Sequence, residues 1–458
     1  MTRRHAAPSS VDRGRLAALM AEERRRFIEA HPRSGQQHER ARRSLLAGVP
    51  MNWMVKWAGD HPPYVAEASG AHFRCLDGHD YIDFCLGDTG AMTGHAPEVT
   101  LEAIRRQLPR GITHMLPTED AAAAGEALAA RFGLPYWQFT LSATDANRFV
   151  IRLAREITGR PRILVFNGCY HGTVDETFAT LDAAGGVVAR HGSIGPPVDP
   201  AVTTRVVEFN DLPALEAALA EGDVACVLAE PALTNIGIVL PDDGYHEALR
   251  EMTRRTGTLL VIDETHTLCA GPGGYTRAQG LSPDFLVVGK PIAGGLPAGT
   301  YGFTQDVADR IVAHSSLEEA DVGGIGGTLA GYALSLAAIR ATLAEVLTDA
   351  AYARMIPLAE RWEAGVNEVL ADHGVPWHVT RLGCRAEYHF SPQPPRNGGG
   401  AASAMDFELE RYLHLFAMNR GILLTPFHNM ALMSPATTEA DVDRHTEVFR
   451  EAVRSLFG

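Results

Sequence analysis

Two ionisable side chains, Asp263 and Lys290, each follow a short apolar run of the sequence. Residues 259–262 precede the aspartate, and residues 285–289 precede the lysine. Apolar runs of this length predict parallel strands that are buried on both faces. Ligands of an open α/β sheet bind just outside the carboxyl ends of its strands. We therefore expect the acid and the amine at one ligand-binding edge.

An aspartate and a lysine at one sheet edge have two explanations. A lysine can attach pyridoxal phosphate as a Schiff base while an aspartate faces the pyridinium nitrogen of this cofactor. A buried aspartate–lysine ion pair at the strand ends would leave the same pattern. These two residues alone leave both interpretations open, so the other motifs must decide.

Two segments offer binding sites for an anion. Ser142-Ala143-Thr144 lies between a predicted strand and a predicted helix, where free N–H groups and the helix dipole favour negative charge. Ordinary capping of the helix is the alternative. The glycine-rich residues 323–327, followed by Thr328, would let the backbone approach a ligand closely. A flexible surface loop is the alternative there.

Two further motifs end predicted strands. Tyr170-His171-Gly172 follows residues 162–166, and its tyrosine ring could stack on a flat heteroaromatic cofactor or simply pack in the core. Glu230 follows residues 223–229 and is either a ligand-facing acid or a solvated loop carboxylate.

The elements that would position these motifs alternate between strand and helix. Strands are predicted at residues 138–141, 162–166 and 223–229 in addition to the two runs described first, and a helix is predicted at residues 146–158. This alternation predicts an α/β fold with a mainly parallel sheet covered by helices on both faces. The other predicted elements are a charged helical segment at 11–46, a hairpin at 64–87, helices at 331–345, 350–373, 407–419 and 440–456, a strand at 383–390 and a Pro/Gly loop at 391–402.

The length of 458 residues exceeds one simple core, so more than one domain is expected. We assign residues 96–340 to a large domain. Residues 1–95 and 341–458, the two ends of the chain, are assigned to a smaller α+β domain.

Composition narrows the class of protein. An apolar fraction of 46% and a charged fraction of 21% are typical of a soluble globular protein, and a net charge of −14 argues against nucleic acid or an anionic membrane as partner. The basic N-terminus lacks an apolar segment, which argues against a secretory signal. The six cysteines contain no CxxC motif and no metal-ligand spacing, so we expect no metal site and buried thiols in a reducing cytoplasm.

The order of the motifs carries more information than each motif alone. A phosphate turn, Tyr-His-Gly, Glu-Pro, Asp-Glu, Lys and Gly-Thr follow one another as in class III pyridoxal-phosphate-dependent aminotransferases of fold type I, which this chain resembles. It looks most similar to the glutamate-1-semialdehyde aminomutase and β-amino acid aminotransferase branch. The resemblance extends from about residue 45 to residue 457 and includes Gly94-His95-Ala96-Pro97. It implies a seven-stranded sheet in the large domain.

The resemblance implies a role for each motif. Lys290 would carry the cofactor and act as the general base, and Asp263 would keep the pyridine nitrogen protonated. Thr328 would reach the phosphate from the neighbouring subunit, so a homodimer is expected. The remaining implied contacts are phosphate binding by Ser142, Ala143 and Thr144, ring stacking by Tyr170, and positions near the ring for Glu230 and Thr265.

The chain departs from the family pattern at two places. Ala143 replaces the usual glycine of the phosphate turn, so the turn is expected to differ slightly. Thr265 replaces the usual aliphatic residue under the ring, and His266 follows it. His266 is interpreted either as a residue that lines the pocket or as one that contacts the residues lining it.

The substrate is predicted from missing arginines. Relatives that bind amino acids place an arginine near the pocket, but residues 421–430 and 50–53 contain none. Arg385 could replace it or be purely structural. We predict a pocket lined by Trp53, Trp57 and Phe427, with His266. The predicted activity is that of an aminotransferase that moves an amino group from a hydrophobic amine or a β-amino acid to a keto acid or another carbonyl acceptor. An aminomutase or racemase is the alternative, and a non-enzymatic protein of the same fold is a third possibility.

Overall fold

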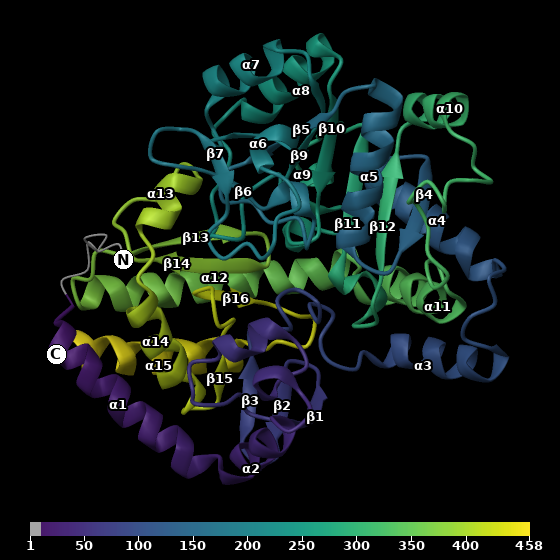
Figure 1. Cartoon of the computed structure of the whole chain (residues 1–458). Coiled ribbons are helices and arrows are strands. Elements are labelled where there is room, and N and C mark those ends of the chain that lie inside the picture. The colour runs from purple at the N-terminus through teal and green to yellow at the C-terminus, as the bar shows by residue number, and fades with distance from the viewer. Residues whose placement is uncertain (1–10) are drawn as a thin grey trace. The chain divides into compact units, whose positions relative to one another are not determined.

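The computed structural model describes residues 11–458 and is shown in Figure 1. The basic residues 1–10, on which the prediction of no secretory signal partly depends, lie outside the described residues. The described chain divides into two compact units. The larger contains Glu98–Asp349 and Pro395–Ala402, and the smaller contains the residues up to Pro97, Ala350–Pro394 and Ser403–Gly458.

The larger unit is built on a sheet that has seven strands within residues 11–458, in the order β4-β12-β11-β10-β9-β5-β8. This confirms the predicted mainly parallel seven-stranded sheet. Strands β5, β9, β10 and β11 are almost completely buried, which explains their continuous apolar sequences. The strands are β4 (Tyr136–Thr140), β5 (Arg162–Phe166), β8 (Thr204–Val207), β9 (Val224–Ala229), β10 (Leu259–Asp263), β11 (Phe285–Gly289) and β12 (Gly299–Phe303).

The register of the central strands brings their carboxyl ends to one edge. β10 and β11 are parallel, with Asp263 beside Val287, so the residues that follow both strands leave the sheet on the same side. β12 runs antiparallel to β11 and to β4. Only a short connection joins β11 to β12, and a parallel crossover needs about a dozen residues or more, so this strand must reverse direction.

Helices and a short hairpin complete the larger unit. Helix α5 packs across the sheet against β4, β9, β10, β11 and β12. The small hairpin consists of β6 (Ala179–Leu181) and β7 (Val187–Ala189). The helices are α3 (Glu98–Gln107), α4 (Glu119–Phe132), α5 (Ala143–Thr158), α6 (Pro200–Thr203), α7 (Leu212–Ala220), α8 (Tyr245–Thr256), α9 (Gly274–Ala278), α10 (Gln305–His314), α11 (Ala333–Ala341) and α13 (Gly398–Ser403).

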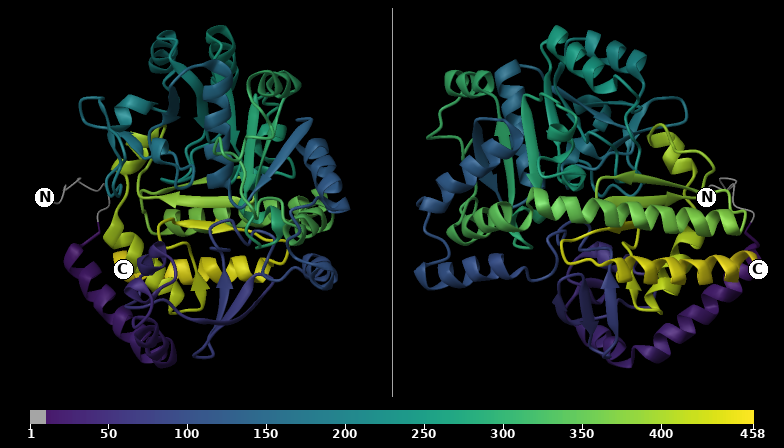
Figure 2. Two further views of the ribbon diagram at one scale, coloured as in Figure 1. Left: turned by 45° about the vertical axis from the view of Figure 1, so that its right-hand side comes forward. Right: turned by 180° about the vertical axis from the view of Figure 1, so that it is seen from behind.

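The smaller unit combines helices with two sheets. One sheet has the strand order β1-β2-β3-β15 and the other β13-β14-β16. Figure 2 shows α12 as a long, continuous helix. The elements are α1 (Arg13–Ala30), α2 (Pro32–Ala41), β1 (Val65–Ser69), β2 (His72–Cys75), β3 (Asp80–Asp83), α12 (Asp349–Asp372), β13 (His378–Leu382), β14 (Arg385–His389), α14 (Phe407–Met418), β15 (Ile422–Leu423), β16 (Met430–Leu432) and α15 (Glu439–Phe457).

Several local predictions are corrected. The helical segment predicted at 11–46 is divided at His31, because Pro32 begins a second helix and removes a backbone donor. Helix α5 begins at Ala143 rather than at residue 146. The predicted loop at 391–402 contains α13, whose glycine-rich sequence is a weak helix former.

Other expectations agree with the structure. All six cysteines are buried, as predicted. Within residues 11–458, no helix combines the length and the apolarity that a membrane crossing requires.

The close approach of β12 to the start of α5 gives a test of the packing. A Cβ atom at Gly299 would overlap with the Ser142 backbone and lie 2.6 Å from Thr140 Oγ1. We expect Gly299→Ala to lower the free energy of unfolding by about 2 kcal/mol, because overpacking forces the backbone to shift. Gly125→Ala on α4 is the matched control: it meets open space and should be neutral or slightly stabilising. Thermal unfolding of both variants measures the difference, and equal stabilities would contradict it.

Candidate active site

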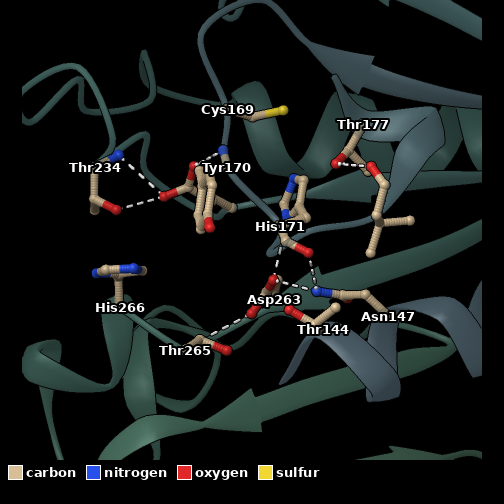
Figure 3. Close-up of polar contacts among 12 residues, drawn as sticks. Thr144, Asn147, Cys169, Tyr170, His171, Thr177, Thr234, Asp263, Thr265 and His266 are labelled. Atoms are coloured by element: carbon tan, nitrogen blue, oxygen red, sulfur yellow. Dashed lines mark hydrogen bonds and ion pairs between the residues drawn. The ribbon is translucent and has the colours of Figure 1, made fainter. Parts of the chain in front are cut away.

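The carboxylate of Asp263, at the end of β10, lies at the centre of a buried hydrogen-bond network (Figure 3). Its Oδ2 atom accepts hydrogen bonds from His171 Nδ1 at 2.9 Å and from Asn147 Nδ2 at 2.8 Å. Its Oδ1 atom accepts the Thr265 N–H at 3.0 Å. The donors come from α5, from the loop after β5 and from the turn after β10, so the network joins three segments.

The network keeps Asp263 ionised. Burial by itself would raise the pKa of Asp263, but the hydrogen bond and charge of His171, with the bonds from Thr265 and Asn147, lower the pKa below its ordinary value. Burial opposes protonation of His171, yet Cys169 and Asp263 raise the pKa of His171 to about 10. The two side chains therefore form a buried ion pair.

Lys290 follows β11 directly and is half-buried. Its Nζ atom lies 2.9 Å from Nε2 of His266. The lysine backbone has φ of 52°, a left-handed conformation that non-glycine residues rarely adopt, and Pro291 follows it. A residue before proline is already disfavoured in the right-handed helical region. Such backbone strain is tolerated where the surrounding structure determines the position of a functional side chain.

The predicted phosphate turn forms the start of α5. Ser142 is the N-cap, and its hydroxyl accepts the Asp145 N–H at 3.3 Å. Thr144 Oγ1 accepts the Thr173 N–H at 3.2 Å. Gly172 lies against Thr144 with φ of 78°, and a Cβ atom there would overlap with the threonine hydroxyl. The glycine of Tyr-His-Gly is thus required by its contact with the turn.

Ala143 fits the turn because its neighbour has no side chain. A Cβ atom at Gly289 would lie 3.0 Å from Cβ of Ala143, which is tighter than an ordinary contact. The methyl group of Ala143 occupies space that Gly289 leaves open. The predicted departure of the turn is therefore accommodated by the residue before Lys290.

Glu230 is not the solvated loop carboxylate that the sequence allowed. It is buried, and its Oε1 atom accepts the Tyr170 N–H at 3.0 Å. Its Oε2 atom accepts the N–H and the hydroxyl of Thr234 at 3.0 and 2.5 Å. Burial raises the pKa of Glu230. Its contacts hold together the loops after β5 and β9, from which the half-buried Tyr170 projects.

The contacts of Asn147 and His171 with Asp263 were not predicted from the sequence. Asn147 is fully buried on α5, one turn after Ala143, and a polar residue on a buried helix face was an available signal. His171 was noted only as part of Tyr-His-Gly. Its contact with Asp263 spans 92 residues of sequence, so no local pattern could reveal it.

The predicted pocket residues fall into two groups. Trp53, Trp57 and Phe427 form an aromatic cluster in the smaller unit, with ring centroids 6.1 Å apart for the two tryptophans and 5.7 Å apart for Trp53 and Phe427. The Lys56 ammonium lies 4.7 Å from the Phe427 ring centroid, so the cluster also carries a cation. His266 belongs to the larger unit.

The structure also locates Thr328, the predicted phosphate contact, and Arg385, the possible substrate-binding arginine. Thr328 is exposed, in the glycine-rich segment of the larger unit. Arg385 is fully buried on β14 and pairs with Glu387 at 3.2 Å, which agrees with the structural alternative for this arginine.

The arrangement fits pyridoxal phosphate. Thr265 Oγ1 and Asn147 Oδ1 are buried beside Asp263, and within residues 11–458 neither has a hydrogen-bond partner. The ionised Asp263 suits a protonated ring nitrogen, and the start of the long helix α5 suits a phosphate. When bound, the cofactor supplies an electron sink for the carbon to which the substrate amino group is attached.

A mainly parallel seven-stranded sheet with this site at its carboxyl edge defines a pyridoxal-phosphate-dependent enzyme of fold type I. The chain belongs to the class-III aminotransferase family, whose family model matches residues 55–453. This confirms the resemblance and the cofactor inferred from the sequence.

Similar proteins include both aminomutases and transaminases. A glutamate-1-semialdehyde 2,1-aminomutase of Thermomicrobium roseum is 33% identical over 435 residues, covering 92% of this chain and 98% of the relative. The crystal structure of a lysine-to-alanine variant of a glutamate-1-semialdehyde-aminomutase from Pseudomonas aeruginosa PAO1, in complex with PMP, is 53% identical with a TM-score of 0.96 and covers 97% and 99% of the two chains. An omega-transaminase from Sphaerobacter thermophilus is 30% identical with a TM-score of 0.84, covering 93% and 98%.

The ion pair of Asp263 and His171 predicts a pH dependence of stability. The raised pKa of His171 means that its stabilisation is complete below the ordinary imidazole value of 6.5 and is lost as the pH rises toward about 10. Without cofactor, the wild-type protein should have a higher free energy of unfolding than His171→Phe at pH 6.5. This difference should decrease by more than about 1 kcal/mol between pH 6.5 and about pH 9. Thermal unfolding at a series of pH values measures this difference.

His246→Phe is the matched control. His246 is also buried in the larger unit, but burial lowers its pKa and its Nε2 contacts the Pro231 carbonyl at 2.7 Å. The contribution of His246 to the free energy of unfolding should therefore decrease as the pH falls below 6.5. This trend is opposite to that of His171. If His171→Phe and His246→Phe show the same pH trend, the ion pair is not charged.

Proposed function

We propose that this class III enzyme is an aminomutase that moves an amino group between neighbouring carbons of glutamate 1-semialdehyde. The main support for this proposal is the 53% identity, over nearly the whole of both chains, to the Pseudomonas aeruginosa enzyme named for this activity. The Thermomicrobium relative supports the same substrate. These comparisons favour the aminomutase, which was the alternative in the sequence analysis, over the aminotransferase that was predicted first.

The site geometry supports specific roles for the chain's residues. Lys290 attaches the cofactor, and its freed amine then takes the proton from the substrate carbon and returns it elsewhere. Asp263, held ionised by His171, keeps the ring nitrogen protonated. Tyr170 stacks on the ring. The other proposed cofactor contacts are Ser142, Ala143 and Thr144 to the phosphate, and Thr265 and Glu230 beside the ring.

We also propose that the enzyme acts as a homodimer in which Thr328 of each chain completes the neighbouring phosphate site. The exposure of Thr328 is compatible with such a contact. The cytoplasmic location stays a prediction from composition.

An aminotransferase is the second candidate. It is supported by the aromatic cluster of Trp53, Trp57 and Phe427, which would suit a hydrophobic amine, and by the similarity to the Sphaerobacter omega-transaminase. The Lys56 ammonium beside Phe427 weakens this argument, since a cation also suits the carboxylate of glutamate 1-semialdehyde.

The amino-group balance separates the two candidates. An aminomutase should convert glutamate 1-semialdehyde to 5-amino-4-oxopentanoate without any added keto acid, because the amino group stays on the same carbon skeleton. With pyruvate as acceptor, 1-phenylethylamine and β-phenylalanine should react with kcat/KM at least about tenfold lower. Product analysis measures both reactions. Inactivity on the semialdehyde together with rapid, pyruvate-dependent use of either amine would favour the aminotransferase instead.

A further inference from the structure

We propose that His266 is a positioning residue that strengthens Lys290 as a base by accepting a hydrogen bond from the protonated amine. The proposal rests on the role of Lys290 given under Proposed function and adds a residue to it. It begins from the 2.9 Å distance between Nε2 of His266 and Nζ of Lys290.

The contact joins two nitrogen atoms, so one must donate and the other must accept. A lysine ammonium can only donate, and neutral imidazole has one nitrogen that accepts. Two positive charges at this distance would repel each other strongly. The stable arrangement is therefore a neutral imidazole that accepts from a protonated Nζ.

The backbone holds His266 rigidly at this place. On one side, the Thr265 N–H is fixed to Asp263. On the other, the buried Glu264 accepts the Thr267 hydroxyl at 2.6 Å, and its carbonyl accepts the Leu268 N–H at 2.8 Å. The residues on both sides of His266 are thus anchored to buried acids, and its half-buried side chain reaches the Lys290 amine that follows the next strand.

The same turn is anchored again further along the chain. The Glu264 carboxylate also accepts hydrogen bonds from the backbone of α9, through the Tyr275 and Thr276 N–H groups at 3.0 and 2.5 Å. Gly274 packs so closely on Glu264 that a Cβ atom would overlap with its carboxylate. A loop with this many internal bonds keeps one geometry, which a precise nitrogen–nitrogen contact requires.

The hydrogen bond affects the proton-transfer step. As the substrate C–H bond breaks, its electron pair stays with the cofactor-bound carbon system and its proton forms a new N–H bond at Lys290 Nζ. A neutral acceptor at Nε2 stabilises the positive charge that develops on Nζ. A protonated His266 would oppose this charge, so the rate of proton transfer should fall at acidic pH as the imidazole becomes charged.

Other titratable groups surround this edge, and burial raises the pKa values of two of them, Glu230 and Glu264. The titratable groups on the neighbouring elements are Asp263 and Glu264 after β10, Lys290 after β11, Tyr170 and His171 after β5, and Glu230 after β9. Asp263 and His171 form the ion pair described above, so they do not titrate between about pH 5 and pH 8.

Two substitutions separate the hydrogen bond from the titration. His266→Gln places an amide oxygen near Nε2, so it keeps an acceptor but cannot be protonated. His266→Phe removes both properties. In the cofactor-loaded full-length protein, we expect the proton-transfer rate near pH 8 to stay within about fivefold for His266→Gln and to fall at least about tenfold for His266→Phe. Both variants should lose the acidic decline that the wild type shows.

A second readout needs no turnover. The visible absorbance of the cofactor attached to Lys290 changes as the attached nitrogen loses its proton, and an acceptor favours the protonated form. The midpoint pH of this change should be at least about half a unit lower in His266→Phe than in the wild type and nearly unchanged in His266→Gln. His314→Gln, an exposed histidine of α10, is the matched control and should change neither readout.

The outcomes are distinct. A wild-type pH profile and absorbance midpoint in a cofactor-loaded His266→Phe would overturn the proposal, as would equal effects in His314→Gln. Lys290→Ala is measured in parallel. If Lys290→Ala keeps a covalently attached cofactor, the proposed role of Lys290 fails and the proposal falls with it. If Lys290→Ala has no covalently attached cofactor while both His266 variants behave as wild type, the role of Lys290 stands and only the His266 proposal is contradicted.

Discussion

The site depends on one constraint, the burial of a negative charge at Asp263. An unpaired buried carboxylate is strongly unfavourable and would take up a proton. Hydrogen bonds from His171, Asn147 and the Thr265 backbone offset this and keep the carboxylate charged. Since the three donors lie on separate segments, satisfying one charge also fixes the start of α5, the loop that carries Tyr170 and the turn that carries His266.

Two other buried acids also join separate segments around the same edge, although burial raises their pKa values. Glu230 fixes the loops after β5 and β9 through Tyr170 and Thr234. Glu264 fixes the turn after β10 to the start of α9 through Tyr275. Irregular loops are held by side-chain carboxylates where no strand can pair with them. The chain therefore holds the loops at this edge of the sheet in a single geometry.

The sheet, Asp263 and Lys290 could be predicted from the sequence because their signals are local. The apolar run at residues 162–166 corresponds to β5 residue for residue, and Asp263 and Lys290 directly follow or end such runs. The partners of these residues could not be found in this way. The contact between Lys290 and His266 depends on the register of β10 with β11. Helix α13 was also not predicted, because it forms in a segment whose glycines and prolines favour a loop.

The proposed role of Lys290 as the residue that carries pyridoxal phosphate can be tested directly. Borohydride reduction of the cofactor-loaded protein makes the bond between the cofactor and its lysine permanent, and peptide mass spectrometry then locates it. Lys56 provides an internal comparison, since it is the lysine beside the aromatic cluster of the smaller unit. The reduced cofactor should be found on the peptide that contains Lys290. Its attachment to Lys56, or to no lysine at all, would contradict the assignment of Lys290.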